Sequence, residues 1–360
     1  MFKRPDDQLA THYWLCSAIS PLVDSAALAK EIESGQLDWD MVMAQAHRGM
    51  VLPLLYRALI RKQLLDCVPK EVGQALEGFF DLNVLLNSRL RAQVKAVTVC
   101  LNRYDIVHVW LKGATHLLRD DWQQSPRTML DLDVWIPHRG QHDAAFKKLA
   151  AMGYESVAEE GGQLLGGEHH YPPLFKNGES ARLEFHASVV PTKYSPLLPE
   201  GPALNHTQWR EWEGEKVGVL NPVDQAMHAY IQCVYMSGKQ FLAGQVTLMK
   251  THDFVERFML AGPSALKSES FQYLHQKPWA EPANMFFTYL GRAFGVASEF
   301  NTNTLYEDRL RYPALARLSK ARDFYQRVLK SIRQGRVGPW HDLPARLWRN
   351  IREIFSVKIA

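Results

Sequence analysis

The spacing of apolar residues over the first hundred positions is that of amphipathic helices. In residues 41–64 and 71–104, apolar side chains recur every three or four positions, which places them on one side of a helix. Pro53 is expected to kink the first of these segments, and Pro69 to separate the two. We therefore expect residues 1–100 to form an N-terminal helical region.

Near residue 105 the spacing changes to one typical of strands. Residues 105–114 (DIVHVWLKGA) contain a β-branched run, and residues 127–137 (RTMLDLDVWIP) alternate between apolar and polar side chains. Such alternation predicts a strand with one buried face. The segment between them, residues 115–122, is expected to form one or two helical turns.

A helix and two further strands are predicted after the second strand. Residues 139–155 have helical spacing, with Gly153 as the expected stop. The Gly-rich segment 161–167 precedes residues 169–175 (HHYPPLF), and Asn177-Gly178 then predicts a hairpin turn before an alternating strand over 181–190. This order predicts a small mixed sheet rather than a helical bundle.

After Pro222 the helical spacing returns and continues to the basic end of the chain. The pattern therefore predicts an α+β protein, in which a small mixed sheet over residues 101–220 lies between helical regions. The flanking regions are residues 1–100 and 221–360.

Composition narrows the class of protein. No uninterrupted apolar run reaches the roughly 18 residues of a membrane span. Lys3 and Arg4 are followed by Asp6 and Asp7 rather than by a long apolar segment, so a secretory signal is not expected. The four cysteines are scattered without a CxxC pair, which argues against a structural zinc site or a disulfide framework. A cytoplasmic protein without membrane attachment is the resulting expectation.

Charge is distributed unevenly. The net charge of the chain is +4, yet residues 301–360 alone contain 13 Lys and Arg against five Asp and Glu. Such a segment is either a solvated helical face or a surface for an anionic partner such as RNA, and the sequence leaves both open.

Two acids in residues 127–137 carry the main chemical signal. Asp131 and Asp133 are two positions apart in a predicted strand, so their side chains share one face. Like charges this close repel each other unless something positive lies between them. A divalent cation such as Mg²⁺ or Mn²⁺ meets this need, and two such ions held by shared carboxylates are the arrangement of phosphoryl and nucleotidyl transfer.

Further residues support the hypothesis of a metal site for phosphoryl or nucleotidyl transfer. Glu184, in the strand predicted over 181–190, is a candidate third metal ligand. Lys112 and Gly113 lie where the strand over 105–114 ends, a position suited to contact with phosphate. Arg127 precedes the two acids and is expected either to bind a phosphate or to brace the acidic cluster.

These motifs together resemble the nucleotidyltransferase superfamily with a DNA polymerase beta-like fold. The chain looks most like a poorly characterised bacterial branch of it, with Lys-Gly-Ala at 112–114, Arg-x-x-x-Asp-x-Asp at 127–133 and Gly-Tyr at 153–154. A His-His-x-x-Pro-Leu-Phe stretch at 169–175 and Leu-Glu-Phe-His at 183–186 also match. The resemblance is specific over 105–190 and softer over the helical flanks.

The resemblance implies a metal-dependent transfer of NMP from an NTP to an acceptor. Asp131, Asp133 and Glu184 would then be the catalytic metal ligands for two Mg²⁺ or Mn²⁺ ions. Lys112, Gly113 and Arg127 would bind the nucleotide phosphates, with His170 and His186 as candidates for support of the ligands. Ala114 replaces the Ser of the wider superfamily, so no hydroxyl is available there to hold a phosphate.

Two other functions remain open at this point. A glycosyltransferase can use a D-x-D motif to bind Mn²⁺ and a sugar nucleotide, although this accounts for neither Lys112-Gly113 nor Glu184. A non-catalytic interaction protein that retains the fold is the other alternative, and Ala114 favours it. The acceptor is not specified by the sequence: protein, RNA, peptide and small molecule are all compatible with it.

Overall fold

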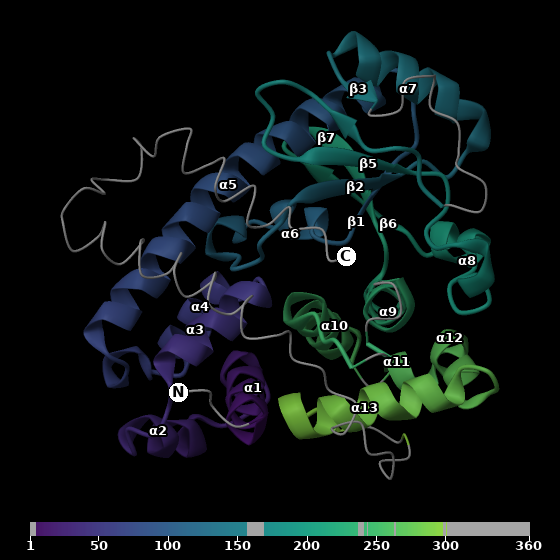
Figure 1. The fold of residues 1–360 in the computed structure, drawn as a ribbon. Coiled ribbons are helices and arrows are strands. Elements are labelled where there is room, and N and C mark those ends of the chain that lie inside the picture. Colours follow the sequence, from purple (N-terminus) through teal and green to yellow (C-terminus); the bar gives the residue numbers. More distant parts are fainter. Residues whose placement is uncertain are drawn as a thin grey trace.

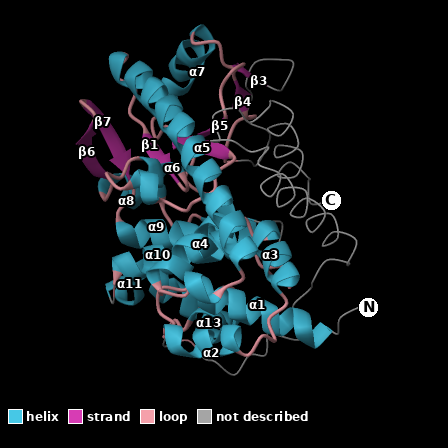
Figure 2. Cartoon of the chain, turned by 90° about the vertical axis from the view of Figure 1, so that its left-hand side faces the viewer, coloured by secondary structure: helices cyan, strands magenta, loops and turns pink. Residues whose placement is uncertain are grey.

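The structure is a computed structural model that describes residues 5–156, 169–236, 241–242, 244–262, 264–297 and 300. Strands lie at one end and most helices at the other (Figure 2). The basic segment 301–360 and the Gly-rich segment 161–167 lie outside the described residues.

Residues 5–103 are mainly helical, as predicted for the N-terminal flank of the sheet. Asp24 and Asp38 cap two of the helices, each accepting a hydrogen bond from a backbone N–H of the first turn. The last helix is 34 residues long and runs diagonally past the sheet (Figure 1). The helices are α1 (Pro5–Ile19), α2 (Ser25–Glu33), α3 (Trp39–Arg48), α4 (Leu52–Arg61) and α5 (Lys70–Arg103).

Among the described residues, the central region forms a mixed sheet of seven strands in the order β3-β4-β5-β2-β1-β7-β6. β2 pairs in parallel with β5 and antiparallel with β1. The strands are β1 (Val109–Leu111), β2 (Asp131–Trp135), β3 (Glu155–Ser156), β4 (Leu174–Phe175), β5 (Arg182–His186), β6 (Gln208–Trp212) and β7 (Glu215–Val219). The predicted α+β fold with a mixed sheet and helical flanks is confirmed.

Short helices connect these strands. Residues 114–117 form α6 (Ala114–Leu117), and the helix predicted over 139–155 is α7 (His142–Ala151). Gly153 follows α7 with a φ of 88°. The predicted Asn177-Gly178 turn joins β4 to β5, with Gly178 at a φ of 87°. Both glycines adopt the left-handed conformation that side chains disfavour.

The hairpin of β6 and β7 was not predicted. Its turn is Glu213-Gly214, and both residues have positive φ, 51° and 76°. Two successive left-handed residues form the turn that suits the twist of a two-residue hairpin. β7 pairs in parallel with β1, so this late segment joins the sheet beside the strand that leads into Lys112.

Alternate residues of the strands enter two separate apolar cores. Trp110, Leu132 and Phe185 belong to a cluster that includes α5 and α7. The Trp110 indole N–H donates to Thr98 Oγ1 of α5 over 3.0 Å. Leu111 and Trp135 face the other way, into the cluster shared with the C-terminal helices. The acid-bearing face of β2 is therefore directed at those helices.

The helices after the sheet pack against the N-terminal helices. Asn221 caps α9, and Ser20 at the end of α1 donates to the carbonyl of Phe294 in α13 over 2.6 Å. Residues of α1, α4, α9, α10 and α13 share one apolar core. The elements are α8 (Glu200–Asn205), α9 (Pro222–Ile231), α10 (Leu248–Ala261), α11 (Ser264–Lys267), α12 (Glu269–Gln272) and α13 (Ala280–Phe294).

The division into regions 1–100, 101–220 and 221–360 stays a prediction.

Among the described residues, none of the helices has the length and apolarity needed to cross a membrane.

Candidate active site

Asp133 and Glu184 lie opposite each other on the parallel strands β2 and β5. Asp131 precedes Asp133 by two positions and therefore lies on the same face of β2. Asp133 is almost fully buried, whereas Asp131 and Glu184 are partly exposed. The pairing of two strands that are fifty residues apart in sequence thus brings the three predicted carboxylates onto one face of the sheet.

Lys112 supplies the positive charge beside these acids. Its ammonium group contacts the carboxylate of Asp133 and lies 3.9 Å from that of Glu184. Lys112 follows Leu111, the residue opposite Asp133 in the antiparallel pairing of β1 and β2. The end of β1 therefore delivers the lysine to the acidic face.

Lys112, rather than Gly113, has the left-handed backbone. The φ of Lys112 is 49°, while Gly113 is in the right-handed helical region at −58°. Gly113 is required for a different reason: a Cβ built on it would lie 2.7 Å from Cγ and 2.9 Å from Sδ of Met129. The glycine lets the turn after β1 pack closely against the segment that leads into β2.

Burial and the neighbouring charges shift the pKa values of these three acids in opposite directions. Burial raises the pKa of Glu184 to about 8, and the neighbouring Asp133 and Asp131 carboxylates add to the shift. Burial also raises the pKa of Asp131, with Asp133 contributing. For Asp133 the effect of burial is outweighed by Lys112 and His186, which hold its pKa well below its usual range. The cluster therefore keeps Asp133 ionised and gives Glu184 proton affinity near neutral pH.

His186 binds Asp133 from the next strand. Its Nε2 lies 2.8 Å from Oδ1 of Asp133, and its ring is fully buried. Burial and the nearby Lys112 lower the pKa of His186 to about 4, so its ring is neutral at pH 7. Because an ionised carboxylate only accepts hydrogen bonds, the Nε2–H of His186 donates to Asp133. His186 thereby orients the carboxylate.

Within the described part of the chain, the structure gives His170 no hydrogen bond to these carboxylates. His170 forms an isolated bridge with His186, and their ring centroids are 5.5 Å apart. Nδ1 of His170 lies 3.0 Å from the carbonyl oxygen of its neighbour Tyr171. His170 therefore packs against the histidine that supports Asp133.

Arg127 forms an ion pair with an acid that the sequence did not single out. Its Nε lies 2.9 and 2.8 Å from the two carboxylate oxygens of Asp253 in α10. The backbone of Arg127 is held from the other side, where Asn87 of α5 donates to its carbonyl over 3.2 Å. Arg127 is thus paired with Asp253 of α10, and its two predicted roles, phosphate binding and bracing of the Asp131–Asp133 cluster, stay predictions.

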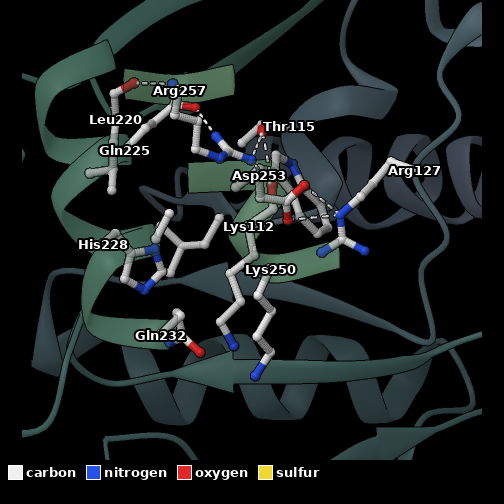
Figure 3. A pocket seen from close by; sticks show the side chains of 13 residues that line it. Lys112, Thr115, Arg127, Leu220, Gln225, His228, Gln232, Lys250, Asp253 and Arg257 are labelled. Carbon is white, nitrogen blue, oxygen red and sulfur yellow. Dashed lines mark hydrogen bonds and ion pairs between the residues drawn. The ribbon is translucent and has the colours of Figure 1, made fainter. Parts of the chain in front are cut away.

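α10 contributes a further residue to the turn after β1. Arg257 donates to the carbonyl of Lys112 over 2.9 Å and to Thr115 Oγ1 over 3.2 Å, and it also binds Gln225 of α9. Figure 3 shows Arg257 reaching from α10 toward Thr115 and Gln225. Lys250, Asp253 and Arg257 recur with helical spacing in α10, and this was the available signal for an inward-facing polar stripe.

The acidic cluster suits a divalent cation. A carboxylate oxygen of Asp133, one of Glu184 and a ring nitrogen of His186 all lie within 4.8 Å of one another. The two carboxylates are oxygen donors that Mg²⁺ and Mn²⁺ accept. The Nε2 of His186 carries the proton donated to Asp133, so His186 supports the ligand Asp133. Asp131 is outside this group of three but shares the face of β2 on which the group lies.

A comparison of the sequence with known protein families gives a match that includes the residues of this site. Residues 35–263 match the family described as uncharacterised nucleotidyltransferase, which is more than half of the chain. The chain belongs to this family. The match contains β1, β2 and β5 with all the predicted site residues, and it extends over α9 and α10. Comparisons with curated proteins and with solved structures find no match.

Proposed function

We propose that this nucleotidyltransferase family member is a metal-dependent enzyme that moves NMP from an NTP to an acceptor. The observation that carries the proposal is the register of β2 and β5, which sets Glu184 opposite Asp133 with Asp131 on the same face. Three carboxylates gathered in this way need positive charge, and bound divalent cations meet that need.

Each residue has a distinct part in this scheme. Asp131, Asp133 and Glu184 would hold the cations, and His186 would keep the Asp133 carboxylate oriented through its Nε2–H. When bound, the cations neutralise the triphosphate and favour ionisation of the attacking hydroxyl. Glu184, beside the cation nearest the acceptor, would assist removal of the proton from the attacking hydroxyl.

The bond changes define the substrates. An acceptor oxygen forms a bond to the α-phosphorus of the NTP, the bond from that phosphorus to the bridging oxygen breaks, and pyrophosphate leaves with the electron pair. Lys112 lies beside the carboxylates and carries the positive charge suited to the departing phosphates. Catalysis of this kind relies on positioning and charge neutralisation rather than on a covalent intermediate.

The acceptor is the open part of the proposal. A hydroxyl or phosphate on a protein, RNA, peptide or small molecule satisfies the chemistry equally. An anionic partner at the basic segment 301–360 is compatible with the charge of that segment, which lies outside the described residues.

Transfer of label from α-³²P NTPs tests the proposal. Purified protein is incubated with each of the four labelled NTPs and Mg²⁺ or Mn²⁺, in the presence of itself alone, RNA or a cell extract. We expect metal-dependent labelling of one acceptor class, reduced at least about 100-fold by Asp133→Asn, a loss typical when a key electrostatic group is removed. Asp121→Asn, at an exposed acid outside the cluster, is the matched control.

Two results would contradict it. The absence of both label transfer and any NTP-dependent thermal shift would favour the non-catalytic interaction protein. A thermal shift with UDP- or GDP-sugars but not with NTPs would favour the glycosyltransferase instead.

A further inference from the structure

A pocket beside the acidic cluster is formed by the C-terminal helices. Its lining includes Lys112 from the end of β1, His228 from α9 and Lys250 from α10. Figure 3 shows the Lys112 and Lys250 side chains extending in the same direction, each ending in its ammonium group. The helices thus add a second lysine to the one that contacts Asp133.

The position of Lys250 is set by two polar residues, Asp253 and Arg257, that follow it on the same side of α10. Asp253, three positions later, binds Arg127 ahead of β2, and Arg257, seven positions later, binds the turn at Lys112. Residues three and seven positions apart lie on one side of a helix. These contacts hold α10 against both strands of the site, with Lys250 turned toward the pocket.

The two lysines are close enough to affect each other. Burial lowers the pKa of Lys250, and the positive charge of Lys112 lowers it further. Two partly buried ammonium groups in one pocket repel each other, so an anion between them is favourable. His228 adds a neutral polar group: its side chain is 3% exposed, and its Nε2 has no hydrogen-bond partner within the described part of the chain.

A triphosphate has the negative charge that this arrangement favours. Its α-phosphate must lie near the carboxylates that hold the cations, and its β- and γ-phosphates must extend away from them. Lys112 is the boundary between these two environments, because it contacts Asp133 and also lines the pocket. Lys250 lines the same pocket as Lys112, which makes it a second cation placed to meet the phosphates.

We propose that Lys250, together with Lys112, binds the β- and γ-phosphates of the NTP, so that α10 completes the nucleotide site. This inference rests on the proposed function and assigns a residue outside the strand-borne motifs. Lys250 is a binding residue in this scheme, while Asp253 and Arg257 are positioning residues that act through it and through the turn at Lys112.

Calorimetric binding of nucleotides tests the role of Lys250 without requiring a known acceptor. ATP, GTP, CTP and UTP, and the four matching monophosphates, are titrated in Mg²⁺ into the wild type, Lys250→Met, Lys250→Arg and Lys147→Met. Lys147 is an exposed lysine on α7, so its variant controls for loss of a positive charge elsewhere. Thermal melts check that each variant is folded, and Lys250→Gln replaces Lys250→Met if the latter is not.

For the NTP that the wild type binds, we expect Lys250→Met to weaken affinity at least about tenfold, or about 1.4 kcal/mol. Monophosphate affinity should stay within about twofold, because only the outer phosphates lose a partner, and Lys250→Arg should retain most of the triphosphate affinity. Unchanged triphosphate binding by Lys250→Met would overturn this inference and leave the proposed function standing. No binding of any NTP by the wild type would overturn both.

Discussion

Arg127 and Asp253 form a buried ion pair between two segments that are 126 residues apart in the chain. Arg127 precedes the acid-bearing strand β2, and Asp253 lies in the middle of α10. Their side chains are only 11% and 9% exposed. The pair therefore fastens the C-terminal helices to the sheet at the edge of the candidate site.

Removal of one partner should be costly. Asp253→Ala leaves the Arg127 guanidinium buried without its carboxylate, and we expect the free energy of unfolding to fall by about 3–5 kcal/mol. Asp121→Ala, which breaks the exposed pair with Arg119, should cost less than about 1 kcal/mol. Urea denaturation followed by circular dichroism measures both. Similar losses in the two variants would show that the buried pair has no special role.

His186 should control metal affinity through Asp133. His186→Ala removes the 2.8 Å contact that orients the carboxylate, and loss of such a supporting contact typically weakens metal binding 10- to 100-fold. Titration with Mn²⁺ followed by electron paramagnetic resonance measures this without a nucleotide. His138→Ala, at an exposed histidine after β2, should bind as the wild type does. Equal affinity in His186→Ala and the wild type would contradict the assignment.

The raised pKa of Glu184 should make the metal-free protein less stable as the pH rises. The folded state keeps a proton on Glu184 up to a pKa of about 8, whereas the unfolded chain releases it near pH 4.3. Between these values the folded state binds more protons, so the free energy of unfolding decreases with pH.

Thermal melts in EDTA between pH 5.5 and 8 measure this effect. Glu184→Gln should show a shallower decrease in Tm than the wild type, because the titrating group is gone, and Glu155→Gln, at an exposed acid in β3, should match the wild type. Each kcal/mol corresponds to about 1–2 °C in a protein of this length. Parallel curves for Glu184→Gln and the wild type would rule out this source of pH dependence.

Gly113→Ala should lower the free energy of unfolding, because the added Cβ would collide with the Met129 side chain. The Cβ of Gly113→Ala would lie 2.7 Å from Met129 Cγ, and overpacking of this kind costs about 1–3 kcal/mol. Gly140→Ala is the matched control, because nothing lies within 4 Å of its added Cβ. Chemical denaturation compares them.

A double variant identifies the cause. If the clash with Met129 is responsible, Gly113→Ala combined with Met129→Ala should cost less than the sum of the two single substitutions. Strict additivity would place the cause elsewhere in the turn.

Local spacing was sufficient to predict much of the sheet. Alternation over 127–137 correctly placed Asp131 and Asp133 on one face of β2, and alternation over 181–190 did the same for Glu184 and His186 in β5. The hairpin at Glu213-Gly214 was missed, because its left-handed residues include Glu213, which is not a typical turn residue. Only the structure identified the partner of Arg127, because Asp253 belongs to a helix that is distant in the sequence.

The sequence by itself determined the local elements and the residues that each presents on one face, because strand and helix periods follow from backbone geometry alone. It also carried the motifs that indicated the family. Only the tertiary structure decided that β5 lies beside β2, that Lys112 contacts Asp133, and that α10 brings Lys250, Asp253 and Arg257 to the same place. Those contacts depend on which apolar faces pack together in the folded chain, and local spacing alone does not determine that packing.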